Sequence, residues 1–372
     1  MKISSVYIHI PFCLRKCNYC DFVSFPVEQC AERVNYVSLL TKELALYGDE
    51  ADFSRLKTIY FGGGTPSLMT PGEIEDILKL FPEVEEITLE ANPETLDSEK
   101  LAGFRKAGIN RLSMGVQSFK QEFLTAMGRG HSPRQAKDMV AAAREAGFNN
   151  IGIDLIYGLP GQTLADWRED LAEALALDTE HISLYGLTIE KNTPWGDMLE
   201  KGELAPVNED LAADMLEAAM DTLSAAGYEH YEISNFAKPG FASRHNLAYW
   251  HRDNYLGLGV AAAGCVLDRR MYNAKDLRQY AELINRGELP IVEEERLHID
   301  QIIGEALFLG LRLAEGIDFA AFQEQYGLDP RRRYRRNIAK MVKAGLLEKD
   351  DTSMRLTRRG VLLGNQVFEQ FI

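Results

Sequence analysis

The first half of this chain alternates between two sequence patterns, and this alternation limits the folds open to it. Six short runs are rich in apolar, β-branched and aromatic residues: 5–10, 57–61, 86–91, 111–116, 151–157 and 181–187. Between and after them lie stretches with helical spacing of apolar residues: 30–47, 71–80, 98–107, 133–146, 164–177 and 209–226. Alternating strands and helices predict a parallel sheet in the α/β class. Six such units predict a partial (β/α)6 TIM-like barrel, followed by a short strand at 231–236.

Glycine and polar residues collect at the ends of these predicted strands. A cysteine loop follows the first strand, GGGTP (62–66) follows the second, and EANPE (90–94) ends the third. Gln117 closes the fourth strand, and Asp154 lies in the fifth, which runs into YGLPGQT (157–163). In a (β/α) barrel the carboxyl ends of the strands carry the active site. We therefore expect these residues to surround one cavity.

The charge of the chain argues against nucleic acid as a partner and distinguishes the C-terminal region from the rest. Among 372 residues, Asp and Glu number 56 and Lys and Arg 41, which gives a net charge of −15. An acidic body binds nucleic acid poorly, because that affinity comes from basic surfaces. From residue 296 onward, basic residues instead outnumber acidic residues by three. We predict a barrel domain (1–240), a connecting segment (241–295) and a C-terminal domain (296–372).

The predicted C-terminal domain has a pattern of its own. Helical spacing at 297–313, 319–326 and 331–344 precedes two short strands at 346–349 and 354–357, which resembles a mostly helical, winged-helix-like module. The basic run 331–336 is of the kind that grips nucleic acid, but the acidic body favours a solvated helix face. We find no secretory leader and no apolar run of about 20 residues. We expect a cytoplasmic protein, with peripheral contact to a membrane left open.

Three of the five cysteines fall within eight residues. Cys13, Cys17 and Cys20 are spaced C-x3-C-x2-C, and in a cytoplasmic chain this grouping favours metal binding over disulfides. A structural zinc ion normally takes four protein ligands, and no further Cys-x-x-Cys pair follows. Three thiolates suit a [4Fe–4S] cluster with one iron left open for a ligand. Cys30 and Cys265 are expected to be buried, unreactive thiols.

This cysteine spacing, with YIHIPFC (7–13), GGGTP and YGLPGQT, resembles the radical S-adenosylmethionine (SAM) superfamily. Within it the chain is similar to the subgroup of oxygen-independent coproporphyrinogen III oxidases and HemW-type haem chaperones. The resemblance implies that the three cysteines hold the cluster. It also implies that the open iron chelates the amino and carboxylate groups of SAM.

The same resemblance implies a set of residues around SAM. Backbone groups of Gly63, Gly64 and Thr65 would hold the amino group, and Glu90 would accept the ribose hydroxyls. Contacts to SAM, to a second SAM molecule or to the adjoining cavity are implied for Gln117, Arg129, Asp154, Tyr7 and Tyr19. Structural alternatives stay open: a tight turn at the glycines, a helix cap at Glu90, an internal ion pair of Arg129 and Asp154, and plain aromatic packing.

The sequence HNxxYW (245–250) is the last distinctive motif. A histidine in an aromatic loop is usually structural, yet imidazole is also an axial ligand of haem iron. The motif is typical of the HemW-type chaperones, which makes His245 the expected haem ligand. Two departures from the oxidases agree: Phe22 stands where they carry a fourth cysteine, and only twelve residues precede the cluster.

We therefore expect a haem chaperone without oxidase activity that binds a [4Fe–4S] cluster, SAM and haem. Its expected partners are haem, haem-requiring acceptors such as membrane-bound respiratory enzymes, and an electron donor to the cluster; an oligomer is compatible with the sequence. The alternative is an oxygen-independent coproporphyrinogen III oxidase, which makes protoporphyrinogen IX by oxidative decarboxylation with a SAM-derived radical. A third hypothesis is a redox-sensing regulator that binds DNA through its C-terminal domain.

Overall fold

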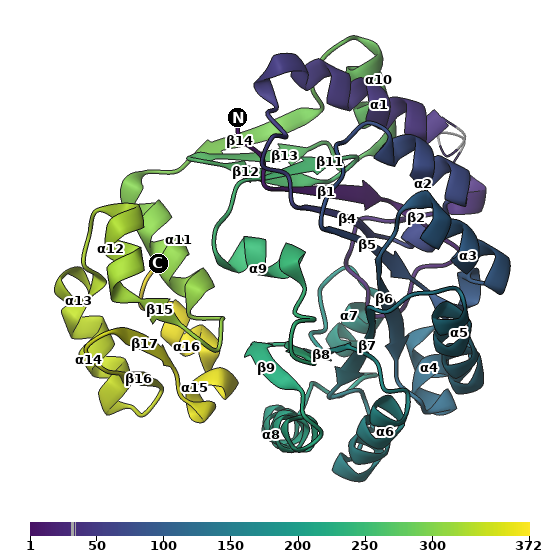
Figure 1. Cartoon of the computed structure of the whole chain (residues 1–372). Helices are drawn as coiled ribbons and strands as arrows, with labels where there is room; N and C mark the ends of the chain where they lie inside the picture. Colours follow the sequence, from purple (N-terminus) through teal and green to yellow (C-terminus); the bar gives the residue numbers. More distant parts are fainter. Residues whose placement is uncertain (31–32, 34) are drawn as a thin grey trace.

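A twelve-stranded sheet forms the centre of the molecule in the computed structural model, which describes residues 1–30, 33 and 35–372. Its six central strands are parallel and adjacent in chain order (Figure 1). They are β1 (Ser5–Ile10), β4 (Thr58–Gly63), β5 (Glu86–Ala91), β6 (Arg111–Gln117), β7 (Ile151–Tyr157) and β8 (His181–Gly186). The prediction of a six-unit partial barrel is confirmed.

Helices cover the outer face of this curved sheet (Figure 1). They are α1 (Tyr36–Tyr47), α2 (Pro71–Leu78), α3 (Ser98–Ala107), α4 (Gln121–Met127), α5 (Pro133–Glu145), α6 (Leu164–Ala176) and α8 (Glu209–Ala225). Thr70 and Thr163 form capping boxes that satisfy free backbone N–H groups at the starts of α2 and α6. Phe104 of α3 is fully buried, and burying such a side chain contributes roughly 1.5–3 kcal/mol. The helix predicted at 30–47 begins only at Tyr36, and its residues 31, 32 and 34 lie outside the described chain.

Further strands extend the sheet at both edges. Beyond β8 lie β10 (Asn235–Ala237) and β9 (Glu229–Glu232), so the single strand predicted at 231–236 is a hairpin. Beyond β1 lie β11 (Tyr255–Leu258), β12 (Ala263–Val266), β13 (Arg269–Asn273) and β14 (Ile291–Arg296). Residues 241–295, predicted as a connecting segment, thus pair with β1 and cover an edge that would otherwise be open. How the chain divides into domains stays a prediction.

The C-terminal part has a hydrophobic core of its own, and Figure 1 shows it beside the barrel. Its helices are α11 (Ile299–Gly310), α12 (Phe319–Tyr326), α13 (Pro330–Arg333), α14 (Arg335–Lys343), α15 (Arg358–Leu362) and α16 (Gly364–Phe368). A small antiparallel sheet joins β15 (Ile317–Asp318), β17 (Ser353–Leu356) and β16 (Leu347–Lys349). The helix predicted at 331–344 is interrupted at Tyr334, which leaves helical geometry.

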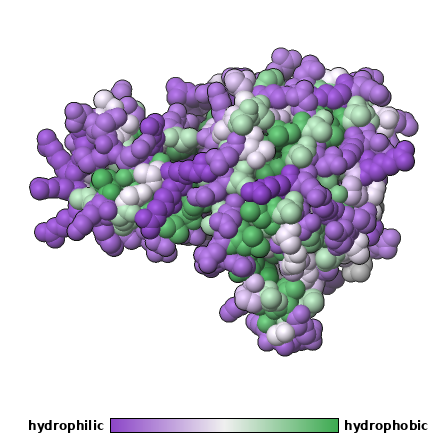
Figure 2. Space-filling view, turned by 90° about the horizontal axis from the view of Figure 1, so that it is seen from below, coloured by the Kyte–Doolittle hydropathy of each residue, from purple (hydrophilic) through white to green (hydrophobic). Residues whose placement is uncertain are grey.

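The surface of the molecule is largely hydrophilic. Figure 2 shows charged and polar side chains over most of one face, with apolar side chains in smaller patches between them. Across the described residues, no helix has the length and hydropathy needed to cross a bilayer.

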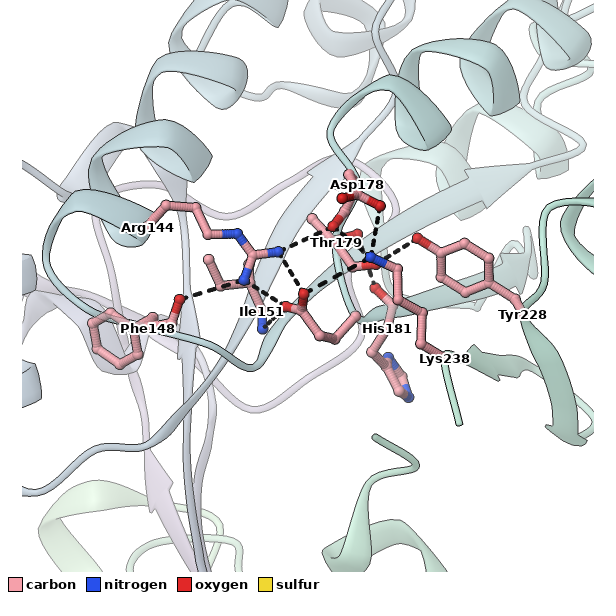
Figure 3. A network of polar contacts seen from close by, with 9 residues as sticks. Arg144, Phe148, Ile151, Asp178, Thr179, His181, Tyr228 and Lys238 are labelled. Carbon is pink, nitrogen blue, oxygen red and sulfur yellow. Dashed lines mark hydrogen bonds and ion pairs between the residues drawn. The ribbon is translucent and has the colours of Figure 1, made fainter. Parts of the chain in front are cut away.

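A polar network ties the amino-terminal ends of β7 and β8 together (Figure 3). The carboxylate of Glu180 accepts hydrogen bonds from Arg144 and from the backbone N–H of Ile151, at 2.7 and 3.0 Å. Lys238 lies 3.9 Å from the same carboxylate and pairs with Asp178. Glu180 is only 9% exposed, so its loss would leave the buried N–H of Ile151 without this acceptor.

We expect Glu180→Ala to lower the free energy of unfolding by about 1–3 kcal/mol, because unpaired buried polar groups carry their full desolvation penalty. Denaturant unfolding of the purified protein measures this change. A matched control is Glu173→Ala, which removes a pair with Lys137 in which both side chains are substantially exposed. The control should change stability by less than about 1 kcal/mol, and an equal effect of both substitutions would contradict the structural role of the network.

Candidate functional site

A cavity of about 590 Å³ opens at the carboxyl ends of the central strands. It brings together eleven of the thirteen predicted site residues. These are Cys13, Cys17, Tyr19, Cys20, Gly63, Gly64, Thr65, Glu90, Gln117, Arg129 and Asp154. The other two, Tyr7 and His245, do not line it.

The three cysteines sit on a loop that is fixed at both ends. Cys13 ends β2 (Phe12–Cys13), which pairs with β3 (Phe25–Pro26) beyond the loop. Burial, with smaller contributions from the neighbouring thiols of Cys17 and Cys13, raises the pKa of the Cys20 thiol to about 11. Such a group of thiols is stable as thiolates only beside a strong positive charge, which iron would supply. Within the described chain, no three His, Cys, Asp or Glu side chains converge on a single ion-sized point, so the thiols form a cavity wall.

Two side chains donate hydrogen bonds to these sulfurs. The Thr65 hydroxyl lies 3.4 Å from the Cys13 sulfur, and Nη1 of Arg129 lies 3.8 Å from the Cys17 sulfur. Hydrogen bonds to sulfur tune the reduction potentials of iron–sulfur clusters. Thr65 and Arg129 therefore contact the cysteine loop itself as well as the cavity.

The glycines at the end of β4 pack closely against their neighbours. A Cβ atom on Gly64 would lie 2.7 Å from the carbonyl oxygen of Phe12 and 3.0 Å from the Cys13 sulfur. The neighbouring Gly63 has φ +111°, and its Cβ would meet the His9 ring at 2.5 Å. At both positions protein atoms already fill the space that a Cβ would take, so only glycine lets the backbone pack this closely against the cysteine loop and β1. The three thiols and the hydrogen bonds that they accept from Thr65 and Arg129 fit a [4Fe–4S] cluster, and Gly63 and Gly64 line the cavity beside it.

Glu90 is held on the wall of the cavity by two donors. Its carboxylate accepts hydrogen bonds from the Tyr60 hydroxyl at 2.8 Å and from the backbone N–H of Gly63 at 3.1 Å. Burial and, to a smaller extent, the charge of Asp154 raise the pKa of Glu90 to about 7. A carboxylate has about four acceptor positions, so positions remain for hydroxyl groups of a ligand.

Gln117 of β6, Arg129 just after α4 and Asp154 of β7 line the same cavity. Gln117 has φ +69°, which is strained for a residue other than glycine, and it lies at an irregularity in the pairing of β6 with β7. Nη2 of Arg129 donates to the carbonyl of Gly115 at 2.6 Å, while its Nε is buried without a partner among the described residues. The free N–H suits an anionic ligand. Asp154 accepts from Ser113 rather than from Arg129, so the internal ion pair left open by the sequence does not form.

The two predicted tyrosines have different positions. Tyr19 lines the cavity beside the cysteines and packs on Trp195, with ring centroids 6.0 Å apart. Tyr7 instead lines a second cavity, and its hydroxyl lies 3.1 Å from Nδ1 of His9. The Tyr7 ring stacks on Tyr60, which itself bonds Glu90. Tyr7 thus contacts Tyr60, which lines the first cavity, but does not line that cavity itself.

His245 lies outside the lining of both cavities, and its role as a haem ligand stays a prediction. Its side chain is 1% exposed. Nδ1 lies 2.8 Å from the Thr58 hydroxyl and Nε2 lies 3.0 Å from the Tyr249 hydroxyl, so both ring nitrogens are engaged. Burial lowers the pKa of His245 to about 3, which keeps the ring neutral. His245 instead joins α9 (Arg244–Trp250) to β4.

Sequence reasoning missed two residues of the first cavity that hold its carboxylates. Tyr60 donates to Glu90, and Ser113 donates to Asp154 at 3.2 Å. Both lie within predicted strands, where the two-residue period places them on the same face as later cavity residues. This alternation along the strand was the only feature of the sequence that could have predicted Tyr60 and Ser113 as cavity residues.

Comparison with known proteins agrees with this site. Residues 7–174 match the model of the Radical SAM superfamily, and residues 297–363 match the HemN C-terminal domain. The chain is 36% identical to the heme chaperone HemW of Bacillus subtilis, with 100% of this chain and 99% of that protein covered. It is 40% identical to the heme chaperone HemW of Escherichia coli over 70% of each protein.

Among solved structures, the chain is similar to the coproporphyrinogen III oxidase HemN of Escherichia coli, a radical SAM enzyme. The TM-score is 0.85 at 24% sequence identity, with 99% of this chain and 90% of that chain covered. At this identity the likeness shows a shared fold, which includes the partial barrel and the C-terminal domain.

Proposed function

Because this chain belongs to the HemW family of the radical SAM superfamily, we propose that it is a haem chaperone. It binds haem and delivers it to haem-requiring proteins, with membrane-bound respiratory enzymes as the acceptors. It works in the cytoplasm and at the membrane surface. Oxidation of coproporphyrinogen is not its activity.

The first cavity supports the proposal that the chaperone binds a [4Fe–4S] cluster and SAM. Cys13, Cys17 and Cys20 hold the cluster, which supplies one iron with an open position and the capacity to exchange one electron with a donor protein. Arg129 lines the cavity and supplies a guanidinium charge for the SAM carboxylate, and the backbone of Gly63 and Gly64 lines the cavity beside the sulfurs, where it holds the amino group. Glu90 accepts the ribose hydroxyls from its fixed position.

Phe22 supports the chaperone over the oxidase. It follows Cys20 by two residues and is 68% exposed, yet it lines the cavity. This is the position at which the oxidases carry a fourth cysteine. A side chain without a thiol can pack against a flat apolar ring but cannot ligate iron or transfer hydrogen.

The raised pKa of Glu90 predicts a pH dependence of SAM binding. Above pH 7 the carboxylate is ionised and accepts charge-assisted hydrogen bonds from the ribose, whereas below pH 7 it holds a proton and accepts them weakly. SAM affinity should therefore rise on the order of tenfold between pH 6 and pH 8. Equilibrium dialysis against labelled SAM measures it. In Glu90→Gln the affinity should be low and flat with pH, and a slope equal to that of the wild type would contradict the role of Glu90.

The proposed function is tested by anaerobic reconstitution with iron and sulfide, followed by two assays on one sample. We expect stoichiometric haem binding and no conversion of coproporphyrinogen III to protoporphyrinogen IX in the presence of SAM and a reductant. Decarboxylation at enzymatic rates would identify an oxidase instead. Failure to bind haem would reject the chaperone.

A further inference from the structure

A second cavity, of about 520 Å³, lies next to the first and has no role in the function described so far. Its lining combines β1, α9, the β11–β12 turn and α11 of the C-terminal part. Asp21 and Phe22 line both cavities. Among the described residues, this short piece of the cysteine loop is the wall between the two cavities. A volume of this size lies within the range that holds a cofactor-sized molecule.

The lining of this second cavity is aromatic. Its aromatic residues other than His9 are Tyr7, Phe22, Tyr249, Trp250 and Tyr255. Aromatic side chains bind flat apolar molecules well, because each ring buries a large apolar surface and loses little conformational entropy. The one Lys or Arg in the described lining, Arg252, is already paired with Glu305 of α11 at 2.8 Å. The carboxyl residues Asp21, Asp253 and Glu305 also belong to the lining. A nucleotide polyphosphate is therefore disfavoured, whereas a flat conjugated ring can pack on the aromatic residues.

The same cavity contains a thiol. Cys265 of β12 lines it and is 7% exposed. Burial raises the pKa of Cys265, while the charges of Arg252 and Arg270 and a hydrogen bond from Arg270 oppose that rise. The charge of Glu305, which pairs with both arginines, raises the pKa of Cys265 further. A cysteine thiolate is an axial ligand of haem iron, and the positive charge of the iron would stabilise the thiolate here.

The HNxxYW motif supplies part of this wall. Tyr249 and Trp250 line the cavity, whereas His245 lies behind them and bonds the Tyr249 hydroxyl. Nε1 of Trp250 is buried and has no partner in the described chain, and the Trp250 ring is held by the guanidinium of Arg312 at 4.3 Å. His245 therefore positions the aromatic wall instead of entering the cavity.

We propose that this second cavity is the haem site, with the Cys265 sulfur as the axial ligand of the iron and His245 as a positioning residue. On binding, the thiol releases its proton to solvent and the sulfur coordinates ferric iron with no change of oxidation state. Haem then sits between the barrel and the C-terminal part, separated from the cluster by Asp21 and Phe22. The inference rests on the proposed function, since it names the place and the ligand of the haem cargo.

Haem titration of the full-length, cluster-loaded protein tests it, with ferric absorption and electron paramagnetic resonance spectra as readouts. Wild type should show a thiolate-ligated ferric haem. Cys265→Ala should lose that signature and bind haem at least tenfold more weakly, with unchanged cluster content. Cys265→His should bind with a nitrogen-ligated spectrum. Cys30→Ala is the matched control, because Cys30 lies outside both cavities, and it should behave as wild type.

Two further variants separate location from ligand. Ala263→Phe adds bulk to the cavity wall and should block haem binding while the cluster is retained. His245→Ala should weaken binding but keep the thiolate spectrum. A thiolate signature that survives in Cys265→Ala, or disappears in His245→Ala, would overturn the assignment. If wild type binds no haem at all, the proposed function fails and this inference fails with it.

Discussion

The Cys17→Ala protein is expected to lose its iron–sulfur cluster and with it the binding of SAM. Cys17 is one of only three thiols on the cavity wall, and its sulfur is the acceptor for Arg129. Removing it leaves two ligands for a cube of four irons. Iron and sulfide content after reconstitution should fall on the order of tenfold or more, and the visible absorption of the cluster should disappear.

Cys30→Ala is the control for this loss, since it removes a cysteine thirteen positions after Cys17 that is half-buried and away from the cavity. It should keep full iron and sulfide content. If Cys17→Ala still assembled a complete cluster, the three-cysteine site would be wrong.

Gly64→Ala should have an effect of similar size without removing any ligand. The added methyl group would approach the Phe12 carbonyl oxygen to 2.7 Å and the Cys13 sulfur to 3.0 Å, so the cysteine loop or β4 must shift. Site geometry that moves by about 1 Å changes function on the order of a hundredfold. We expect SAM affinity, measured by equilibrium dialysis, to fall by about that factor.

A matched substitution is available at Gly72, in the first turn of α2, where an added Cβ meets nothing within 4 Å. Gly72→Ala should leave cluster content and SAM affinity unchanged, and its helix should gain slightly in stability. Equal SAM affinities in Gly64→Ala and wild type would show that the backbone beside the thiols is not a ligand surface.

The barrel and the first cavity were predictable because local patterns place their residues. The strands β1, β5 and β7 have the predicted bounds, since each is a short apolar run between polar turns. The carboxyl ends of adjacent parallel strands meet at one edge, so clusters such as GGGTP and EANPE necessarily converge. The spacing of three cysteines then gave the chemistry of the site.

Contacts between distant segments were not predictable. The Thr58–His245 hydrogen bond joins residues 187 positions apart, and nothing local signals that α9 packs on β4. The same holds for residues 241–295, whose strands find their place only through the pairing of β11 with β1. The position of His245 behind Tyr249 was not predictable either, because a motif shows which residues act together but not which of them lines a cavity.

Transfer of haem to an acceptor tests the chaperone most directly. The haem-loaded protein is mixed with a haem-free respiratory cytochrome in detergent, and in parallel with excess apomyoglobin, which captures only haem that dissociates spontaneously. We predict transfer to the cytochrome that is faster than release to apomyoglobin and that rises with cytochrome concentration. Equal rates, independent of the acceptor and its concentration, would show passive dissociation and contradict the account.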